Sequence, residues 1–236
     1  MSFATEKNIL HASQVKLRCE KEDTPAGCKY PPVFQLYTTN GMPRVAVYTN
    51  DDSKKDNGRI TASLDPIIFE ILMMEIERFA TDASLDGQKI VIGNGKNFDP
   101  QTQKGTEEVV VTTRLVVGRE NGRVYIALLG GKQHHHVKFF FTIQRRFHNY
   151  LNSQGQSDQV QMNNMAARAW ARFMSKTVPA VCAQTWKEPE KKQNGNRQGG
   201  GGGGYNNQNR GNYGGGGGQS YGGGQAASQD DDDLGF

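Results

Sequence analysis

Cysteine is scarce in this sequence, and long apolar runs are absent. The 236 residues contain only three cysteines, and the spacing of Cys19, Cys28 and Cys182 matches no disulfide or zinc framework. A reducing, intracellular compartment is therefore the simpler expectation. No run of about 18 apolar residues could cross a membrane, and the first residues, MSFATEKNILHAS, lack the pattern of a secretory signal. We expect a cytoplasmic protein, in the host cytoplasm if its origin is a phage.

Catalytic and metal-binding motifs are missing as well. There is no Walker loop, no GxSxG and no HExxH. The run His134–His136 would place only two histidines on one face of a strand, which is too few for a closed zinc site. Asp51, Asp52 and Asp56 lie in a polar loop among basic residues. We therefore expect no enzyme, cofactor or metal, although a nuclease stays open as an alternative.

Charge is unevenly distributed along the chain, whose formal net charge is +4. Residues 229–236 carry four aspartates and no base, and residues 189–228 carry a net +3, so that residues 1–188 carry a net +5. A basic domain joined to an acidic tip suits a polyanionic ligand, and the tip could compete for the same surface.

Three regions follow from composition. Residues 1–188 hold nearly all strand and helix signals, and about 185 residues suffice for one domain with a good core. Residues 189–228 are rich in Gly, Asn and Gln and predict a disordered linker. Residues 229–236, QDDDDLGF, form an acidic tip that we expect to bind other proteins.

Two hairpins dominate the domain. Each has β-branched and aromatic runs around an Asn-Gly pair, Asn40-Gly41 in residues 33–49 and Asn121-Gly122 in the second. Further strands are predicted at 59–63, 88–93 and 137–143, with a long loop at 93–107. Small antiparallel barrels have this pattern, so we predict a mainly β, OB-fold-like antiparallel barrel.

One helix is predicted between strands and one after them. The first begins after Ser63-Leu64-Asp65-Pro66 and runs to about Thr81. Its predicted core residues are Ile68, Ile71, Leu72, Ile76 and Phe79. The second covers roughly 158–178, and its predicted apolar side consists of Val160, Met162, Ala166, Ala169, Trp170, Phe173 and Thr177.

Strand alternation sorts the hairpin side chains into two faces. The predicted core face consists of Phe34, Leu36, Val45, Val47, Val111, Leu115, Val117, Val124, Ile126, Leu128, Val137, Phe139, Phe141 and Ile143. The opposite face repeatedly combines an aromatic with a cation. Aromatic rings stack on unpaired bases and cations neutralise phosphates, which is the chemistry of single-strand binding. The predicted stacking residues are Tyr37, Tyr48, Tyr125 and Phe140, and the predicted phosphate contacts are Arg44, Arg114, Arg123 and Lys138.

The basic domain, the glycine-rich linker, the acidic cluster and the terminal Phe236 together resemble single-stranded DNA-binding proteins. Bacterial members end in acidic residues followed by Ile-Pro-Phe, and QDDDDLGF has Leu-Gly in place of Ile-Pro. The size of the domain and its terminal helix are similar to those of tailed-phage members, which favours a monomer or dimer over the bacterial tetramer.

The resemblance implies sequence-independent binding and protection of single-stranded DNA during replication, recombination and repair. It also implies that the tip recruits a polymerase, a helicase or primase, or a nuclease, and lowers DNA affinity by occupying the binding face. The tip residues that carry these roles are Asp230, Asp231, Asp232, Asp233, Leu234 and Phe236.

Two further classes stay open. The segment YNNQNRGNYGGGG resembles the tails of RNA-associated proteins, although the RNP1 signature is absent. A structural or assembly protein would have negligible affinity for nucleic acid. Competition between DNA and RNA oligomers separates the first of these from a DNA-binding protein.

Overall fold

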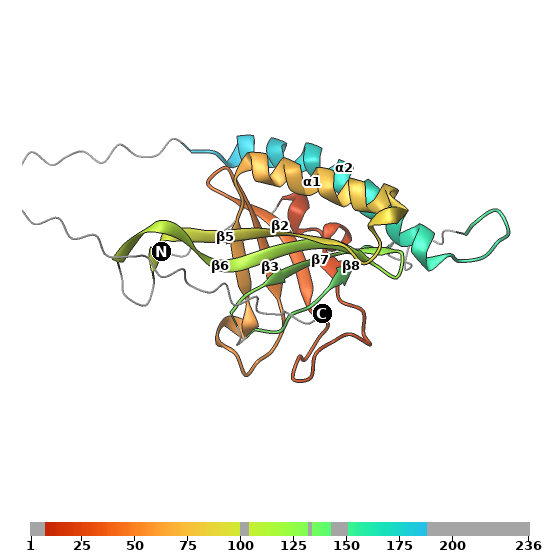
Figure 1. Ribbon diagram of the computed structural model, residues 1–236, viewed down its shortest axis with the longest axis horizontal. Coiled ribbons are helices and arrows are strands. Elements are labelled where there is room, and N and C mark those ends of the chain that lie inside the picture. The colour runs from red at the N-terminus through yellow and green to blue at the C-terminus, as the bar shows by residue number, and fades with distance from the viewer. Residues whose placement is uncertain (1–7, 100–103, 132–133, 143–150, 188–236) are drawn as a thin grey trace, which may run out of the picture. The chain divides into compact units, whose positions relative to one another are not determined.

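The computed structural model describes residues 8–99, 104–131, 134–142 and 151–187 (Figure 1). The predicted linker and tip, together with Ile143, lie outside the described residues. The domain boundary at residue 188 therefore stays a prediction.

The described strands form two antiparallel sheets of four strands each. The first contains β1 (Leu17–Arg18), β2 (Val33–Thr39), β3 (Met42–Tyr48) and β4 (Ile60–Ser63), in chain order. The second contains β5 (Lys89–Asp99), β6 (Lys104–Glu120), β7 (Arg123–Leu129) and β8 (Phe139–Phe140), also in chain order. The prediction of a mainly β fold is confirmed. The described strands form two separate sheets, however, and not one closed barrel.

Both predicted hairpins are present. Asn40 and Gly41 have φ values of 51° and 72°, and Asn121 and Gly122 have values of 50° and 75°. Positive φ at both central residues is the signature of the type I′ turn, whose twist matches that of the flanking strands. The Asn-Gly pairs thus fix the β2–β3 and β6–β7 registers.

The predicted loop at 93–107 was wrong in most of its length. β5 runs to Asp99 and β6 begins at Lys104, so most of this segment is an extended ribbon. Within β6, only Arg114–Glu120 pair with β7, which leaves the outer part of the ribbon two-stranded. Val111 is consequently 46% exposed and is not a core residue.

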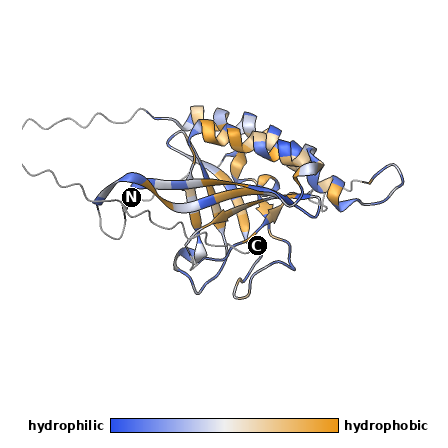
Figure 2. Ribbon diagram, viewed as in Figure 1, coloured by the Kyte–Doolittle hydropathy of each residue, from blue (hydrophilic) through white to orange (hydrophobic). Residues whose placement is uncertain are grey.

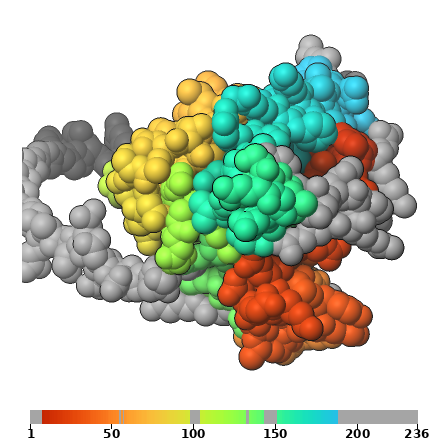
Figure 3. Space-filling view, turned by 90° about the vertical axis from the view of Figure 1, so that its right-hand side faces the viewer, coloured from red at the N-terminus to blue at the C-terminus, as the bar shows by residue number. Residues whose placement is uncertain are grey.

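Two helices lie side by side over the sheets (Figure 1). α1 (Pro66–Thr81) begins where the Asp65 side chain accepts a hydrogen bond from the backbone N–H of Ile67. α2 (Gln159–Thr185) is longer than predicted and continues through Pro179. Seen end-on in Figure 3, residues of α1 (orange to yellow) and α2 (teal to blue) share one flank of the molecule.

One hydrophobic core serves both sheets and both helices. Phe34 of β2 is fully buried in it, with its ring centroid 5.8 Å from that of Phe139 and 6.5 Å from that of Trp170. Figure 2 shows that the strands beneath the helices are mostly hydrophobic. Apart from Val111, the predicted core residues of the two hairpins are buried, as are Val137, Phe139 and Phe141.

The predicted helix faces need correction. Ile71 is 42% exposed, whereas Phe69 and Met73 are buried. On the predicted side of α2, Met162 is buried and Ala166 and Trp170 are partly buried against the core, whereas Val160 and Phe173 are exposed. The buried residues of α2 are Met162, Asn163, Ala167, Ala171, Met174, Val178 and Val181. Asn163 can be buried because its side chain forms hydrogen bonds with the backbone N–H and carbonyl oxygen of Val124 in β7.

No helix among the described residues is both long enough and apolar enough to span a membrane.

Candidate nucleic-acid interface

The outer face of the first sheet, on the side opposite Phe34, gathers aromatic and basic side chains. Tyr37 and Arg44 are direct cross-strand partners in β2 and β3, and Tyr48 shares their face because it lies four residues beyond Arg44. All three side chains are half-buried. We call this surface, completed by Arg18 and Arg59, the tyrosine face.

Arg59 lies between the two tyrosines. Its guanidinium carbon is 5.8 Å from the ring centroid of Tyr37 and 5.3 Å from that of Tyr48. Its Nη2 also donates a hydrogen bond of 3.4 Å to the Tyr37 hydroxyl. Both rings are thus within the range of a cation–π contact, which holds them in fixed positions on an exposed surface.

The loop at 50–58 presents Arg59. Thr49 donates from its hydroxyl to the carbonyl oxygen of Gly58 over 3.2 Å. Gly58 has φ 66°, and a Cβ there would lie 2.0 Å from the Thr49 hydroxyl oxygen. Only glycine therefore fits at the position directly before Arg59.

A buried carboxylate anchors the same loop. Asp51 accepts from the Ser53 hydroxyl at 2.6 Å and lies 2.9 Å from Nε2 of His135. The Ser53 hydrogen bond is the main reason that the pKa of Asp51 is below its ordinary value. Burial, followed by the nearby charge of Lys54, lowers the pKa of His134.

No group of three His, Cys, Asp or Glu residues in the described part of the chain could hold a metal ion. His135 of the histidine run instead contacts Asp51, as given above. This contact joins the loop at 50–58 to the segment that precedes β8.

Arg18 extends the tyrosine face at one end. It is exposed and pairs with Val33, which in turn pairs with Tyr48, so Arg18 points to the same side as Tyr48. Arg18 and Arg59 were missed by sequence reasoning. The alternation of β4 could have identified Arg59, since Arg59, Thr61 and Ser63 share one face.

Four predicted residues of the second sheet also lie together. Tyr125 and Phe140 are cross-strand partners with centroids 6.0 Å apart. The Arg123 guanidinium is 4.1 Å from the Phe140 centroid, and Lys138 Nζ is 5.1 Å from that of Tyr125. We call these residues the second aromatic cluster.

The second aromatic cluster is less available than the tyrosine face. Tyr125 is only 4% exposed, and a Cβ on Gly118 would lie 2.6 Å from its hydroxyl oxygen. Burial, followed by Glu120, raises the pKa of Tyr125. Glu20 pairs with Arg123, and Glu120 lies 2.8 Å from Lys138 Nζ. A base or phosphate would have to displace these contacts before it could bind.

Arg114, the remaining predicted phosphate contact, is exposed on β6 opposite Leu129. It is the only predicted cation of the second sheet outside the second aromatic cluster.

No family model, curated protein or solved structure matches this chain.

Proposed function

We propose that this protein binds single-stranded DNA without sequence preference and protects it during replication, recombination and repair. The single observation that carries the proposal is the tyrosine face, where Arg59 lies between Tyr37 and Tyr48 beside Arg44. Rings that a cation holds in place offer stacking platforms to unpaired bases, and the arginines neutralise the adjacent phosphates. We also propose that the protein acts in the cytoplasm and that it is not an enzyme.

We also propose that the two sheets take the place of the OB-fold-like barrel that the strand pattern predicts. Their edges are joined by the Asn94 side chain of β5, which donates to the Ser63 carbonyl oxygen of β4. Because one core serves both sheets, the strands can support a continuous binding surface although their ladder is interrupted.

Titration of a fluorescent dT oligomer tests the proposal. Phosphate contacts release counterions from the strand, with a slope of log K against log[salt] of about −0.7 per phosphate. Contacts from Arg18, Arg44 and Arg59 imply a slope near −2. If Arg123 and Lys138 also leave their carboxylates, the slope approaches about −3.5.

Two comparisons decide between the ligand classes. Duplex DNA should bind more weakly than dT, because stacking needs unpaired bases, and oligo-U should compete less well than oligo-dT.

Arg59→Ala should weaken binding, whereas Arg78→Ala on α1 should not. Binding that does not depend on salt would contradict the proposed contacts, and preferred competition by oligo-U would favour an RNA-binding protein.

The acidic tip is proposed to recruit replication and recombination proteins and to compete with DNA. Trp186 packs on Gly41 of the β2–β3 turn, where an added Cβ would come within 2.8 Å of it. The chain therefore leaves α2 beside the hairpin that carries Tyr37 and Arg44. A linker of 40 residues has a root-mean-square reach of about 35 Å, which can return Asp230–Asp233 to this hairpin.

Deletion of residues 229–236 is expected to tighten dT binding, and more at low salt than at high salt, because exposed charges are screened within about 10 Å at 0.1 M. Phe236→Ala should abolish partner recruitment in a pull-down while DNA affinity stays nearly unchanged, since the four aspartates remain. Weaker DNA binding after the deletion, or unchanged partner capture by Phe236→Ala, would refute this role of the tip.

A further inference from the structure

The outward side of α1 exposes large apolar residues that the described part of the chain leaves uncovered. Ile67 is 71% exposed, Met74 is 69% exposed and Ile71 is 42% exposed. Their positions, i, i+4 and i+7, place them in one row along the helix. Such rows on an otherwise polar surface mark sites of association.

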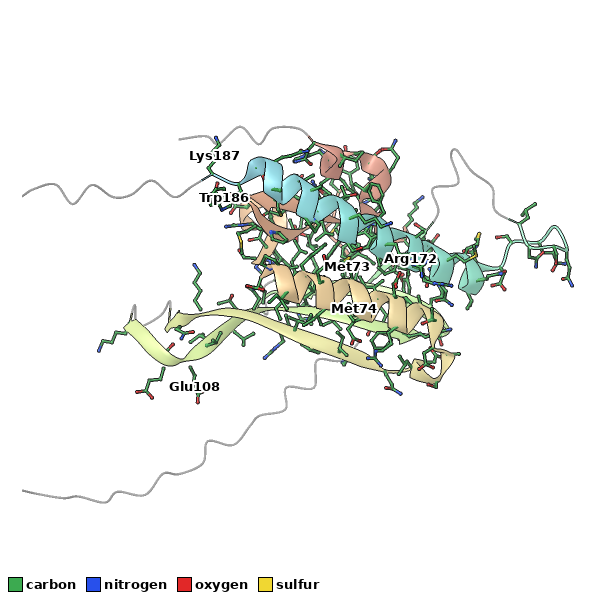
Figure 4. The ribbon with its side chains drawn as sticks, turned by 90° about the horizontal axis from the view of Figure 1, so that it is seen from above. Met73, Met74, Glu108, Arg172, Trp186 and Lys187 are labelled. Atoms are coloured by element: carbon green, nitrogen blue, oxygen red, sulfur yellow. The ribbon has the colours of Figure 1, made fainter. Side chains whose placement is uncertain are left out.

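α2 offers a matching row beside it. Met165 and Phe173 are 40% and 43% exposed, and Ala169 lies between them in the same row. A groove of about 400 Å³ separates the helices, with Met73 and Met74 on one side and Ala171 and Ser175 on the other. Figure 4, seen from above, shows Met73 and Met74 on α1 and Arg172 on α2, the helices that flank this groove.

The two helices differ in charge. α1 contains Glu70, Glu75, Glu77 and Arg78, a net −2, whereas α2 contains Arg168, Arg172 and Lys176 and no acidic residue, a net +3. Arg172 binds Glu77 within the chain, which joins the helices into one layer. This helix layer, defined as α1 and α2 together, therefore has an acidic and a basic half.

We propose that the helix layer is the interface of a two-fold symmetric homodimer. A two-fold axis parallel to the helices places α1 of one copy over α2 of the other. Acidic and basic halves then face each other twice, as an isologous interface requires. Because α1 and α2 run in opposite directions in Figure 1, the facing helices are also antiparallel, which favours their dipoles.

The size of the layer fits such a dimer. At 1.5 Å per residue α1 is about 24 Å long and α2 about 40 Å, and with neighbouring axes about 10 Å apart the layer covers about 600 Å² in projection. Side-chain relief raises the accessible area towards the roughly 800 Å² that each partner buries in a standard interface. The surface of α1 alone would be too small for a standard interface, so the proposed interface includes both helices.

The acidic tip and a nucleic acid strand are poorer occupants of this surface. Each carries charge of one sign, so that each would be attracted by one half of the layer and repelled by the other. Neither would match the apolar rows on both helices. A second copy satisfies both halves and both rows.

Sedimentation of the full chain between about 1 and 100 µM tests the proposal. We expect a dimer, with a dissociation constant raised at least about tenfold by the double change Ile67→Asp and Met74→Asp. Tyr30→Asp is the matched control, because Tyr30 is 60% exposed but lies outside the helices. Circular dichroism checks that each variant is folded.

A charge exchange tests the orientation of the copies. Lys176→Glu and Glu70→Lys should each weaken association, and the two changes combined should restore much of it. The proposal is overturned by a monomer at every concentration, by a dimer that the Ile67→Asp, Met74→Asp variant retains, or by a monomer that dimerises only when residues 229–236 are removed. The last result would identify the tip as the occupant.

Discussion

Tyr48→Ala and Tyr37→Ala are each expected to weaken binding of oligo-dT by about 5- to 150-fold, because one stack between a base and an aromatic ring is worth about 1–3 kcal/mol. Both rings lie on the tyrosine face, where each contacts Arg59. The change removes a stacking platform and also the ring that positions the arginine. Fluorescence anisotropy at fixed salt measures the loss.

Conservative and matched variants make this result specific. Tyr48→Phe keeps the ring and should bind nearly as well as the unchanged protein. Tyr30→Ala removes an exposed tyrosine from a loop outside the tyrosine face and should have little effect. If Tyr30→Ala weakens binding as much as Tyr48→Ala does, the assignment of the binding face is wrong.

Phe34→Ala is expected to lower the free energy of unfolding by about 3–5 kcal/mol, the usual cost of removing a fully buried phenylalanine. Phe34 has no exposed surface and contacts Phe139 of the second sheet and Trp170 of α2. The cavity therefore opens where three parts of the fold meet. Chemical denaturation followed by circular dichroism measures the change.

Val91→Ala provides the comparison for this stability experiment. Val91 is 51% exposed on β5, so its truncation should change the free energy of unfolding by less than about 0.5 kcal/mol. Tyr125→Ala should also destabilise the domain, because Tyr125 is buried against Phe140. Equal stability of Phe34→Ala and the unchanged protein would contradict the described core.

Local patterns predicted the parts of the fold that local interactions determine. The Asn-Gly turns set the hairpin registers, and the alternation in β2 and β3 identified Phe34 and Val45 as core residues. The capping residue Asp65 and the adjacent Pro66 likewise marked the start of α1. Each of these features depends on residues close together in the chain.

Features that depend on distant neighbours could not be predicted in the same way. Alternation separated the two faces of β6 and β7, but Val116, Tyr125 and Ala127 are buried although they lie opposite the predicted core face. A polar residue, Asn163, is 2% exposed on α2, which shifted the buried side of that helix from the one that apolar periodicity indicated.

The candidate site was predicted in outline. Tyr37, Arg44 and Tyr48 lie together because one hairpin carries all three. Arg18 and Arg59 lie beside them because β1 pairs with β2 and β4 pairs with β3, and no sequence motif predicts these pairings. The ion pairs of Arg123 with Glu20 and of Lys138 with Glu120 could not be predicted, because the two partners of each pair are distant in the sequence. The roles of Arg123 and Lys138 as phosphate contacts stay predictions.

α2 completes the domain through a few specific hydrogen bonds. Asn163 accepts from the Val124 N–H at 2.6 Å and donates to the carbonyl oxygens of Val124 and Phe141 at 3.0 Å each. Trp170 donates from its indole to the Val15 carbonyl oxygen at 2.8 Å, across 155 residues of sequence.

These bonds can form only after the residues of α2 have been synthesised. At about 5–20 residues per second, the 155 residues between Val15 and Trp170 take about 8–30 s to synthesise. For most of that interval Phe34 lacks the tryptophan that packs against it, and Val124, once made, waits for a further 39 residues until Asn163 is synthesised. We therefore expect the nascent chain to display apolar surface until α2 emerges, which is the kind of surface that chaperones shield.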